Sequence, residues 1–408
     1  MDKKMIKLLA ILAGLILLVV VLMMLANGGN GGKKHSYDDV VTEFVSATKK
    51  YLKKNPSRYP TESTGYTTLT YSFLEEEKYI KSASDLFKNK DANCYGDITV
   101  YYLDEDKYDY VPNLTCNVNG EQSLPKNLSN TLIGDGEVNV VLSGSGLYKR
   151  INGKWVSTEE ELSSGASDDD IYYFYRGNEE LDLNNYVLID NMLFRVVSIA
   201  NDGNMLMLFD GALRSSYPWD KRYNQEVGKS QGINTYYENG VKSAAMEKLD
   251  QFLEGNEKLS DRVPFSESLK YIIDEFDLCI AKRGPDEEGT DGAIECEVKA
   301  EAQQVGLLPA YMYMSASLDE TCTKLSDQTC GNNNYMANYT AFWLVTTNKE
   351  KSNYCFYISK AATQTICSSN ATYKPILNIS SRVQYTSGTG SKEDPYVLDT
   401  SNYTSSKK

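Results

Sequence analysis

The chain has 408 residues, and 56 Asp and Glu against 42 Lys and Arg give it a formal net charge of −14. An acidic surface repels nucleic acid, so we do not expect a nucleic-acid partner. The single histidine, His35, lies just after a Gly-rich segment. A Ser-His-Asp or Cys-His catalytic arrangement in the folded body is therefore not expected either.

The N-terminus combines a basic stub, residues 1–7, with an uncharged apolar run at residues 8–26. About 20 apolar residues suffice for a helix to cross a membrane, and preceding lysines favour a cytoplasmic N-terminus. We therefore expect a single-pass transmembrane helix at 8–26, with the rest of the chain extracellular. The alternative is a cleaved signal peptide, but such peptides have shorter apolar regions, and Met24-Leu25-Ala26 is a poor cleavage site.

All eight cysteines follow the apolar run, which indicates an oxidising extracellular compartment. Zinc is disfavoured, because no C-x-x-C motif is present and the only histidine is His35. Spacing alone does not fix the pairing. The simplest expectation joins neighbours along the chain: Cys94 with Cys116, Cys279 with Cys296, Cys322 with Cys330, and Cys355 with Cys367.

Residues 27–36 are Gly-rich and are expected to form a flexible tether. Residues 37–120 predict a small α+β module with a helix that begins near Tyr37 and ends at Asn55-Pro56. Strands are expected in this module at 66–74 and 97–103.

Residues 121–170 predict a strand at 138–142, a hairpin at 147–156 and a linker at 163–170. The hairpin turns at Asn152-Gly153, which is a favoured two-residue turn.

Residues 171–399 predict a long β-rich unit, followed by a tail at 400–408. A three-strand meander is expected at 186–189, 193–199 and 205–209, with helical segments at about 240–254 and 266–276. The unbroken apolar run at 340–346 predicts a strand that is buried on both faces. Further strands are expected at 354–358, 373–379 and 394–398.

Four ordered stretches of this unit resemble an uncharacterised domain of surface proteins from Gram-positive gut bacteria, which is thought to share the C-type-lectin-like fold of formylglycine-generating enzymes. They are Tyr175-Arg176-Gly177 with Leu193 to Val197, Gly306 to Tyr311 with Ala316 to Asp319, Phe342 to Thr346, and Lys374 to Ile379 with Asp394-Pro395-Tyr396. The resemblance implies a C-type-lectin-like domain at 171–399. Together with the expected transmembrane helix and small α+β module, it gives an α+β fold class. Residues 37–120 also faintly resemble pilin-like subunits.

No catalytic residue, cofactor or metal site is expected. Formylglycine-generating enzymes use a reactive cysteine pair, whereas every cysteine here has a structural partner in the expected pairing. The acidic stretches at 168–170 and 286–292 offer oxygen ligands that suit Ca²⁺, but neither has EF-hand spacing, and a solvated loop is the preferred interpretation.

Binding residues are expected where Asn and Tyr cluster, because these side chains combine flat contact area with adaptable hydrogen bonds. The candidates are Asn332, Asn333, Asn334 and Tyr335, together with Trp219, whose ring suits stacking on a sugar. The alternative for Trp219 is a place in the core.

The sequence therefore predicts a bacterial surface protein with a binding ectodomain, whose ligand is a glycan or another surface protein. Two alternatives remain open. A pilin-like structural subunit would self-associate through the helix at 37–56, and an enzyme on the lectin-like fold would need a free cysteine or a bound metal.

Overall fold

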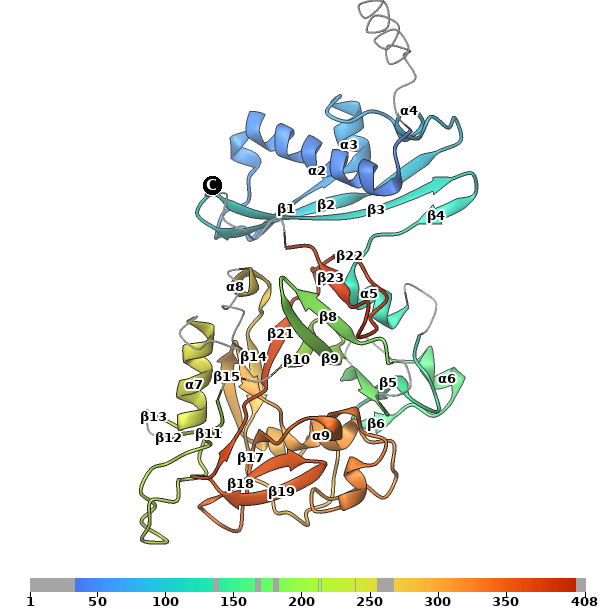
Figure 1. Cartoon of the computed structure of the whole chain (residues 1–408). Helices are drawn as coiled ribbons and strands as arrows, with labels where there is room; N and C mark the ends of the chain where they lie inside the picture. Colours follow the sequence, from blue (N-terminus) through green and yellow to red (C-terminus); the bar gives the residue numbers. More distant parts are fainter. Residues whose placement is uncertain are drawn as a thin grey trace, which may run out of the picture. The chain divides into compact units, whose positions relative to one another are not determined.

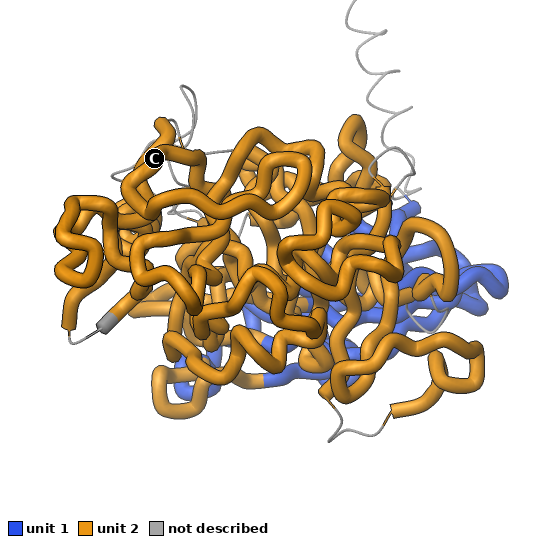
Figure 2. Tube along the Cα trace, turned by 90° about the horizontal axis from the view of Figure 1, so that it is seen from below, with its two compact units in different colours: residues 1–59, 68–99, 112–124 blue, residues 60–67, 100–111, 125–408 orange. Residues whose placement is uncertain are grey.

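The structure is a computed structural model that describes residues 34–134, 139–165, 170–178, 183–211, 213, 215–238, 240–254 and 268–400. These residues form two compact units (Figures 1 and 2). The smaller unit comprises residues 34–59, 68–99 and 112–124. The larger unit comprises residues 60–67, 100–111 and the described residues from 125 onward.

Helix α2, Tyr37–Lys54, is the longest helix of the described chain and begins and ends near the expected positions. Ser36 and Asp39 form a capping box at its start, because the Asp39 amide donates to the Ser36 side chain and the Ser36 amide donates to the Asp39 carboxylate. Its apolar face is buried within the smaller unit, where the Phe44 and Tyr71 rings lie 5.4 Å apart.

A four-stranded sheet in the order β1-β2-β3-β4 carries α2 on one face (Figure 1). The disulfide Cys94–Cys116 joins β2 to β3. The extended segment expected at 66–74 ends early, because the Thr70 side chain accepts from the Phe73 amide and starts a helix. The elements here are β1 (Tyr66–Thr70), α3 (Tyr71–Glu76), α4 (Ala83–Phe87), β2 (Asn93–Asp104), β3 (Lys107–Val118) and β4 (Glu121–Ser123).

The larger unit is built on a central sheet in the order β16-β21-β10-β9-β7-β5-β6, with β8, β23 and β22 continuing from β9. The predicted meander is present as β8, β9 and β10. In the hairpin of β5 and β6, Asn152 (φ 49°) and Gly153 (φ 78°) form the predicted turn. The strands are β5 (Gly146–Ile151), β6 (Lys154–Trp155), β7 (Ile171–Arg176), β8 (Tyr186–Ile189), β9 (Met192–Ala200), β10 (Met205–Phe209), β16 (Gly306–Leu307), β21 (Pro375–Ile379), β22 (Tyr385–Ser387) and β23 (Tyr396–Leu398).

A second sheet, β17-β18-β19, and the hairpin β14-β15 complete the main framework of this unit. Every residue of β17 is buried, as its unbroken apolar sequence predicts. These elements and the main helices are α5 (Leu128–Ile133), α7 (Ala244–Leu253), α8 (Leu269–Ile272), β14 (Phe276–Cys279), β15 (Lys299–Gln303), α9 (Ala310–Ser315), β17 (Phe342–Thr347), β18 (Tyr354–Ser359) and β19 (Ala361–Ile366).

The expected α+β fold class is wrong for the described chain. The described chain is β-rich with few helices, because its Tyr-, Thr- and Val-rich segments pair into sheets and only α2 and α7 exceed two helical turns. The expected transmembrane helix at 8–26 lies outside the described residues. Within the described part of the chain, no helix is both long and apolar enough to cross a membrane.

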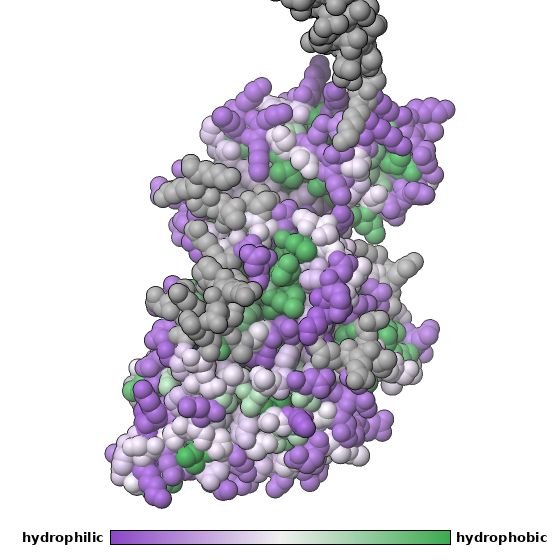
Figure 3. Space-filling model, in the orientation of Figure 1, coloured by the Kyte–Doolittle hydropathy of each residue, from purple (hydrophilic) through white to green (hydrophobic). Residues whose placement is uncertain are grey.

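The four disulfides join the cysteines in the expected order along the chain: Cys94–Cys116, Cys279–Cys296, Cys322–Cys330 and Cys355–Cys367. Such a set fits an extracellular, disulfide-rich protein. On the face seen in Figure 3, hydrophilic side chains dominate and hydrophobic ones gather in small separate groups.

Candidate functional site

A cleft in the larger unit has one face of the central sheet as its floor. Tyr172 of β7 lies opposite Arg150 of β5 and Ala200 of β9. One step along, Phe174 lies opposite Ser198, which in turn lies opposite Leu206 of β10. Residues opposite one another in neighbouring strands share a face. Asn378 of β21 continues this row, so five strands supply one continuous floor.

The walls of this cleft, here named the sheet cleft, come from segments that follow in the chain. They are the hairpin β14-β15, residues 291–293 and the first turn of α9. The volume of the cleft is about 730 Å³. Tyr172 is 37% exposed, so part of its ring is open to a ligand. The sheet cleft therefore combines an accessible aromatic ring with polar groups on its floor and walls.

Arg150 links the floor to one wall. Its Nη2 donates to the Thr290 carbonyl at 2.6 Å, and its Nη1 donates to Ser315 Oγ at 3.2 Å. Its guanidinium carbon lies 4.7 Å from the centre of the Trp155 ring and 5.2 Å from that of Phe174. Burial lowers the pKa of Arg150. These contacts fix the Arg150 side chain as part of the cleft's framework.

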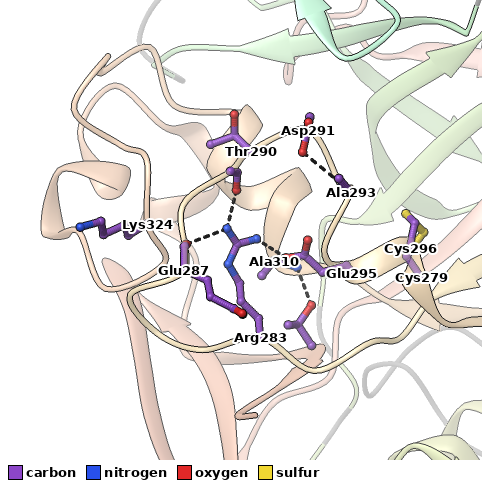
Figure 4. A network of polar contacts seen from close by, with 12 residues as sticks. Cys279, Arg283, Glu287, Thr290, Asp291, Ala293, Glu295, Cys296, Ala310 and Lys324 are labelled. Atoms are coloured by element: carbon purple, nitrogen blue, oxygen red, sulfur yellow. Dashed lines mark hydrogen bonds and ion pairs between the residues drawn. A yellow bond between two sulfur atoms is a disulfide. The ribbon is translucent and has the colours of Figure 1, made fainter. Parts of the chain in front are cut away.

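The loop at 284–292 forms the adjoining wall and is organised by a buried cation (Figure 4). Arg283 Nη2 donates to the carbonyls of Glu287 (3.0 Å) and Gly289, and its Nη1 pairs with Glu295 at 2.7 Å. Burial raises the pKa of Glu295, and the charge of Arg283 opposes that rise. The disulfide Cys279–Cys296 joins β14 to the residue that follows Glu295 and so closes the loop at its base.

The same loop also borders a second cleft, here named the Trp155 cleft, with a volume of about 730 Å³. Residues 288–290 line the Trp155 cleft, whereas residues 291–293 line the sheet cleft. In the Trp155 cleft, the Arg176 guanidinium carbon lies 4.2 Å from the centre of the Trp155 ring. Arg176 Nε donates to the Ser315 carbonyl, and Arg176 Nη2 donates to the Ser317 carbonyl. Burial lowers the pKa of Arg176 to about 10.

Two tyrosines of the sheet cleft are kept in the neutral form. Burial and the nearby carboxylates of Asp170 and Asp202 raise the pKa of Tyr172. Burial, with Tyr172 and Glu295 nearby, raises the pKa of Tyr311. At neutral pH these phenols therefore remain hydrogen-bond donors.

Of the residues that the sequence favours for binding, Trp219 lies in the core. Its side chain is 0% exposed, and its Nε1 donates to the Leu344 carbonyl at 2.9 Å. The ring of Trp219 packs near that of Tyr236, with 6.2 Å between centres. A ring without an exposed face offers no surface on which a sugar could stack.

The cluster at 332–335 is split between core and surface. Asn334 is buried and donates to the carbonyls of Tyr313 and Cys330. Tyr335 is fully buried against the guanidinium of Arg195, at 4.2 Å from ring centre to Cζ. The other two are accessible: Asn333, and Asn332, which donates to the carboxylate of Asp319 on the wall of the Trp155 cleft.

The acidic loop at 286–292 shows no metal site. In the loop at 286–292, two carbonyls that could have faced a cation instead accept from Arg283. Asp168 and Asp169 lie outside the described residues. Across the described ranges, no three His, Cys, Asp or Glu side chains gather closely enough to hold a metal ion. All eight cysteines are in disulfides, so the cysteine-based enzyme alternative lacks its reactive thiol.

Apart from Asp170 and Asp291, which belong to the two acidic stretches considered for Ca²⁺, the residues of the sheet cleft were not singled out by the sequence. Two signals point to them in retrospect: the Asn152-Gly153 hairpin, and the aromatic run 172–175 that follows it. Alternation along β7 sends Tyr172 and Phe174 to one face. Which strands continue that face depends on pairings between distant segments.

Comparisons with known proteins identify no relative of this chain. No family model matches the chain, and neither a curated protein nor a solved structure matches it.

Proposed function

We propose that this chain is an extracellular binding protein and that the sheet cleft recognises a glycan. The observation that carries this proposal is the exposed Tyr172 ring, which lies on the cleft floor among amide and carboxylate side chains. Sugars present apolar ring faces edged by hydroxyl groups. An aromatic surface bordered by hydrogen-bonding groups complements both features.

The polar groups of the sheet cleft suit hydroxyl recognition. The side chains of Asn152, Asn204 and Asn378 line it together with five carboxylates. An amide side chain both donates and accepts hydrogen bonds, and a carboxylate accepts them at both of its oxygens. The Tyr311 phenol at the start of α9 adds a donor. The four disulfides support an extracellular location, and the resemblance of residues 171–399 to a C-type-lectin-like domain agrees with a binding role.

The pilin-like alternative has less support. It requires a free apolar face on the helix at 37–56 for self-association. In the smaller unit, most apolar residues of α2 are already buried, with Tyr51 in edge contact with Phe73 and Tyr79. Self-association through α2 would depend on residues that are only half-buried, such as Val41 and Val45.

A printed glycan array with the full-length, oxidised chain tests the proposal. The full chain is required, because a fragment that starts at residue 171 would lose β5, β6 and Arg150 from the floor. We expect the chain to retain a glycan and Tyr172→Ala to weaken retention about tenfold, which corresponds to ~1.4 kcal/mol.

Tyr223→Ala is the matched control, since Tyr223 is 58% exposed and does not line the sheet cleft. It should bind like the wild type. Failure of the wild type to retain any glycan, or equal retention by Tyr172→Ala and the wild type, would overturn the proposal. Circular dichroism and thermal unfolding of each variant verify that the fold is intact.

A further inference from the structure

The side chains that line the sheet cleft carry an excess of negative charge. Its five carboxylates stand against two cationic side chains, which leaves a formal charge of −3. Neutral sugars need hydrogen-bond partners but not this charge. The carboxylates are Asp170, Asp202, Glu275, Asp277 and Asp291, and the cations are Arg150 and Lys299.

The two cations neutralise this negative charge only in part. Arg150 is buried and directs its guanidinium to the Thr290 carbonyl and the Ser315 hydroxyl. Lys299 lies 4.0 Å from Asp277, at the limit of an ion pair, and both side chains are about half exposed. Within the described part of the chain, this is the one ion pair that any of the five carboxylates makes. The other four carboxylates have no cationic side chain within ion-pair distance among the described residues, although the charge of Arg150 acts electrostatically on Asp170 and Asp291. They can therefore still attract a cationic ligand.

Two of the carboxylates lie beside the exposed ring. Asp170 and Asp202 each act electrostatically on the Tyr172 phenol. The Asp202 carboxylate is oriented by Asn204, whose backbone amide donates to it at 2.9 Å and whose side chain donates at 3.1 Å. An aromatic face attracts an ammonium group, and adjacent carboxylates strengthen that attraction. The Tyr172 ring and the carboxylates of Asp170 and Asp202 can therefore contact the same part of a ligand.

We infer that the sheet cleft selects glycans that carry free amino groups, namely oligosaccharides of deacetylated amino sugars. This inference rests on the proposed function and narrows its ligand class. Such a sugar pairs an apolar ring face, which stacks on Tyr172, with an ammonium group, which approaches Asp170 and Asp202. Its N-acetylated counterpart keeps the ring face but loses the positive charge.

The test compares two oligosaccharides that differ only in acetylation, a β-1,4-linked glucosamine hexamer and its N-acetylated form. Titration calorimetry of the full-length, oxidised chain at neutral pH and about 50 mM salt measures both. We expect the free-amine hexamer to bind at least about tenfold more tightly. We also expect this preference to shrink about tenfold when Asp170 and Asp202 are both replaced by Asn.

Because the whole chain carries a charge of −14, a polycation could bind without using the cleft. The matched control is Glu226→Gln with Glu393→Gln, which changes the net charge equally at two exposed positions outside the cleft. Equal loss of affinity in both double variants would overturn the inference. So would equal or tighter binding of the N-acetylated hexamer, but that result would leave the proposed glycan function standing. Absence of binding by either hexamer also overturns the inference, and the glycan array then decides the proposed function separately.

Discussion

Arg283 and Glu295 form an ion pair in which Nη1 and Oε1 lie 2.7 Å apart and both side chains are fully buried. The pair holds the loop that separates the sheet cleft from the Trp155 cleft. Removal of one partner leaves the other charge buried without compensation, which typically costs about 3–5 kcal/mol. We therefore expect Glu295→Ala to lower the free energy of unfolding by that amount in urea titrations.

Two controls show whether this loss arises from the buried pair. Lys349→Ala removes an exposed partner of Glu287 and should have a much smaller effect. Replacement of both Arg283 and Glu295 by Leu should remain destabilising, because the carbonyls of Glu287 and Gly289 lose their donor. A Glu295→Ala variant that unfolds at the wild-type urea concentration would refute this account.

The disulfide Cys279–Cys296 should restrain the loop between its two cysteines. Replacement of both cysteines by Ser is expected to cost about 2–4 kcal/mol of stability and to speed hydrogen exchange at 284–293. The control is the same replacement at Cys94 and Cys116, whose disulfide joins β2 to β3 in the four-stranded sheet. This control variant should leave hydrogen exchange at 284–293 unchanged. Mass spectrometry of peptides from this loop measures the exchange in both variants. Unaltered exchange in the first variant would show that Arg283 suffices to hold the loop.

Trp219 is expected to contribute to stability through the core. Trp219→Ala removes a fully buried ring and its hydrogen bond to Leu344, so the free energy of unfolding should fall by about 3–5 kcal/mol. Tyr223→Ala, at an exposed position, should change it by no more than about 0.5 kcal/mol. Chemical denaturation measures both variants, and similar effects in the two would contradict the placement of Trp219.

Stability should fall in alkaline solution. Burial raises the pKa of Tyr236, Tyr313 and Tyr335 above the usual tyrosine value near 10. A phenol whose pKa is higher in the folded protein than in the unfolded chain stabilises the fold fully below pH about 10. That contribution is lost as the pH rises toward the folded-state pKa, by up to about 1.4 kcal/mol per pH unit for each such phenol.

The free energy of unfolding should accordingly be lower at pH 11 than at pH 8. Tyrosinate absorbance followed through the same titration should show that the buried phenols ionise together with unfolding. Equal free energies of unfolding at the two pH values would contradict the prediction. Both measurements omit reductant, and mass spectrometry after the pH 11 incubation verifies that the disulfides are intact.

Local features of this protein follow from its sequence. The capped helix at 37–54, the Asn152-Gly153 turn, the buried strand at 342–347 and the pairing of neighbouring cysteines each depend on residues close together in the chain. Their physical determinants are capping, turn preference, apolar run length and short loop closure, all of which a short window of sequence contains.

The sheet cleft was decided by the tertiary structure alone. Its floor joins β5, β7, β9, β10 and β21, and the most distant of the pairings that set their register, between Met205 of β10 and Ile379 of β21, joins residues about 170 positions apart. Burial likewise separated Trp219 and Tyr335 from the accessible Asn332 and Asn333, although all four have residue types that suit recognition. Periodicity tells which side of a strand a residue occupies, but only long-range packing decides whether that side is covered by core or left open to a ligand.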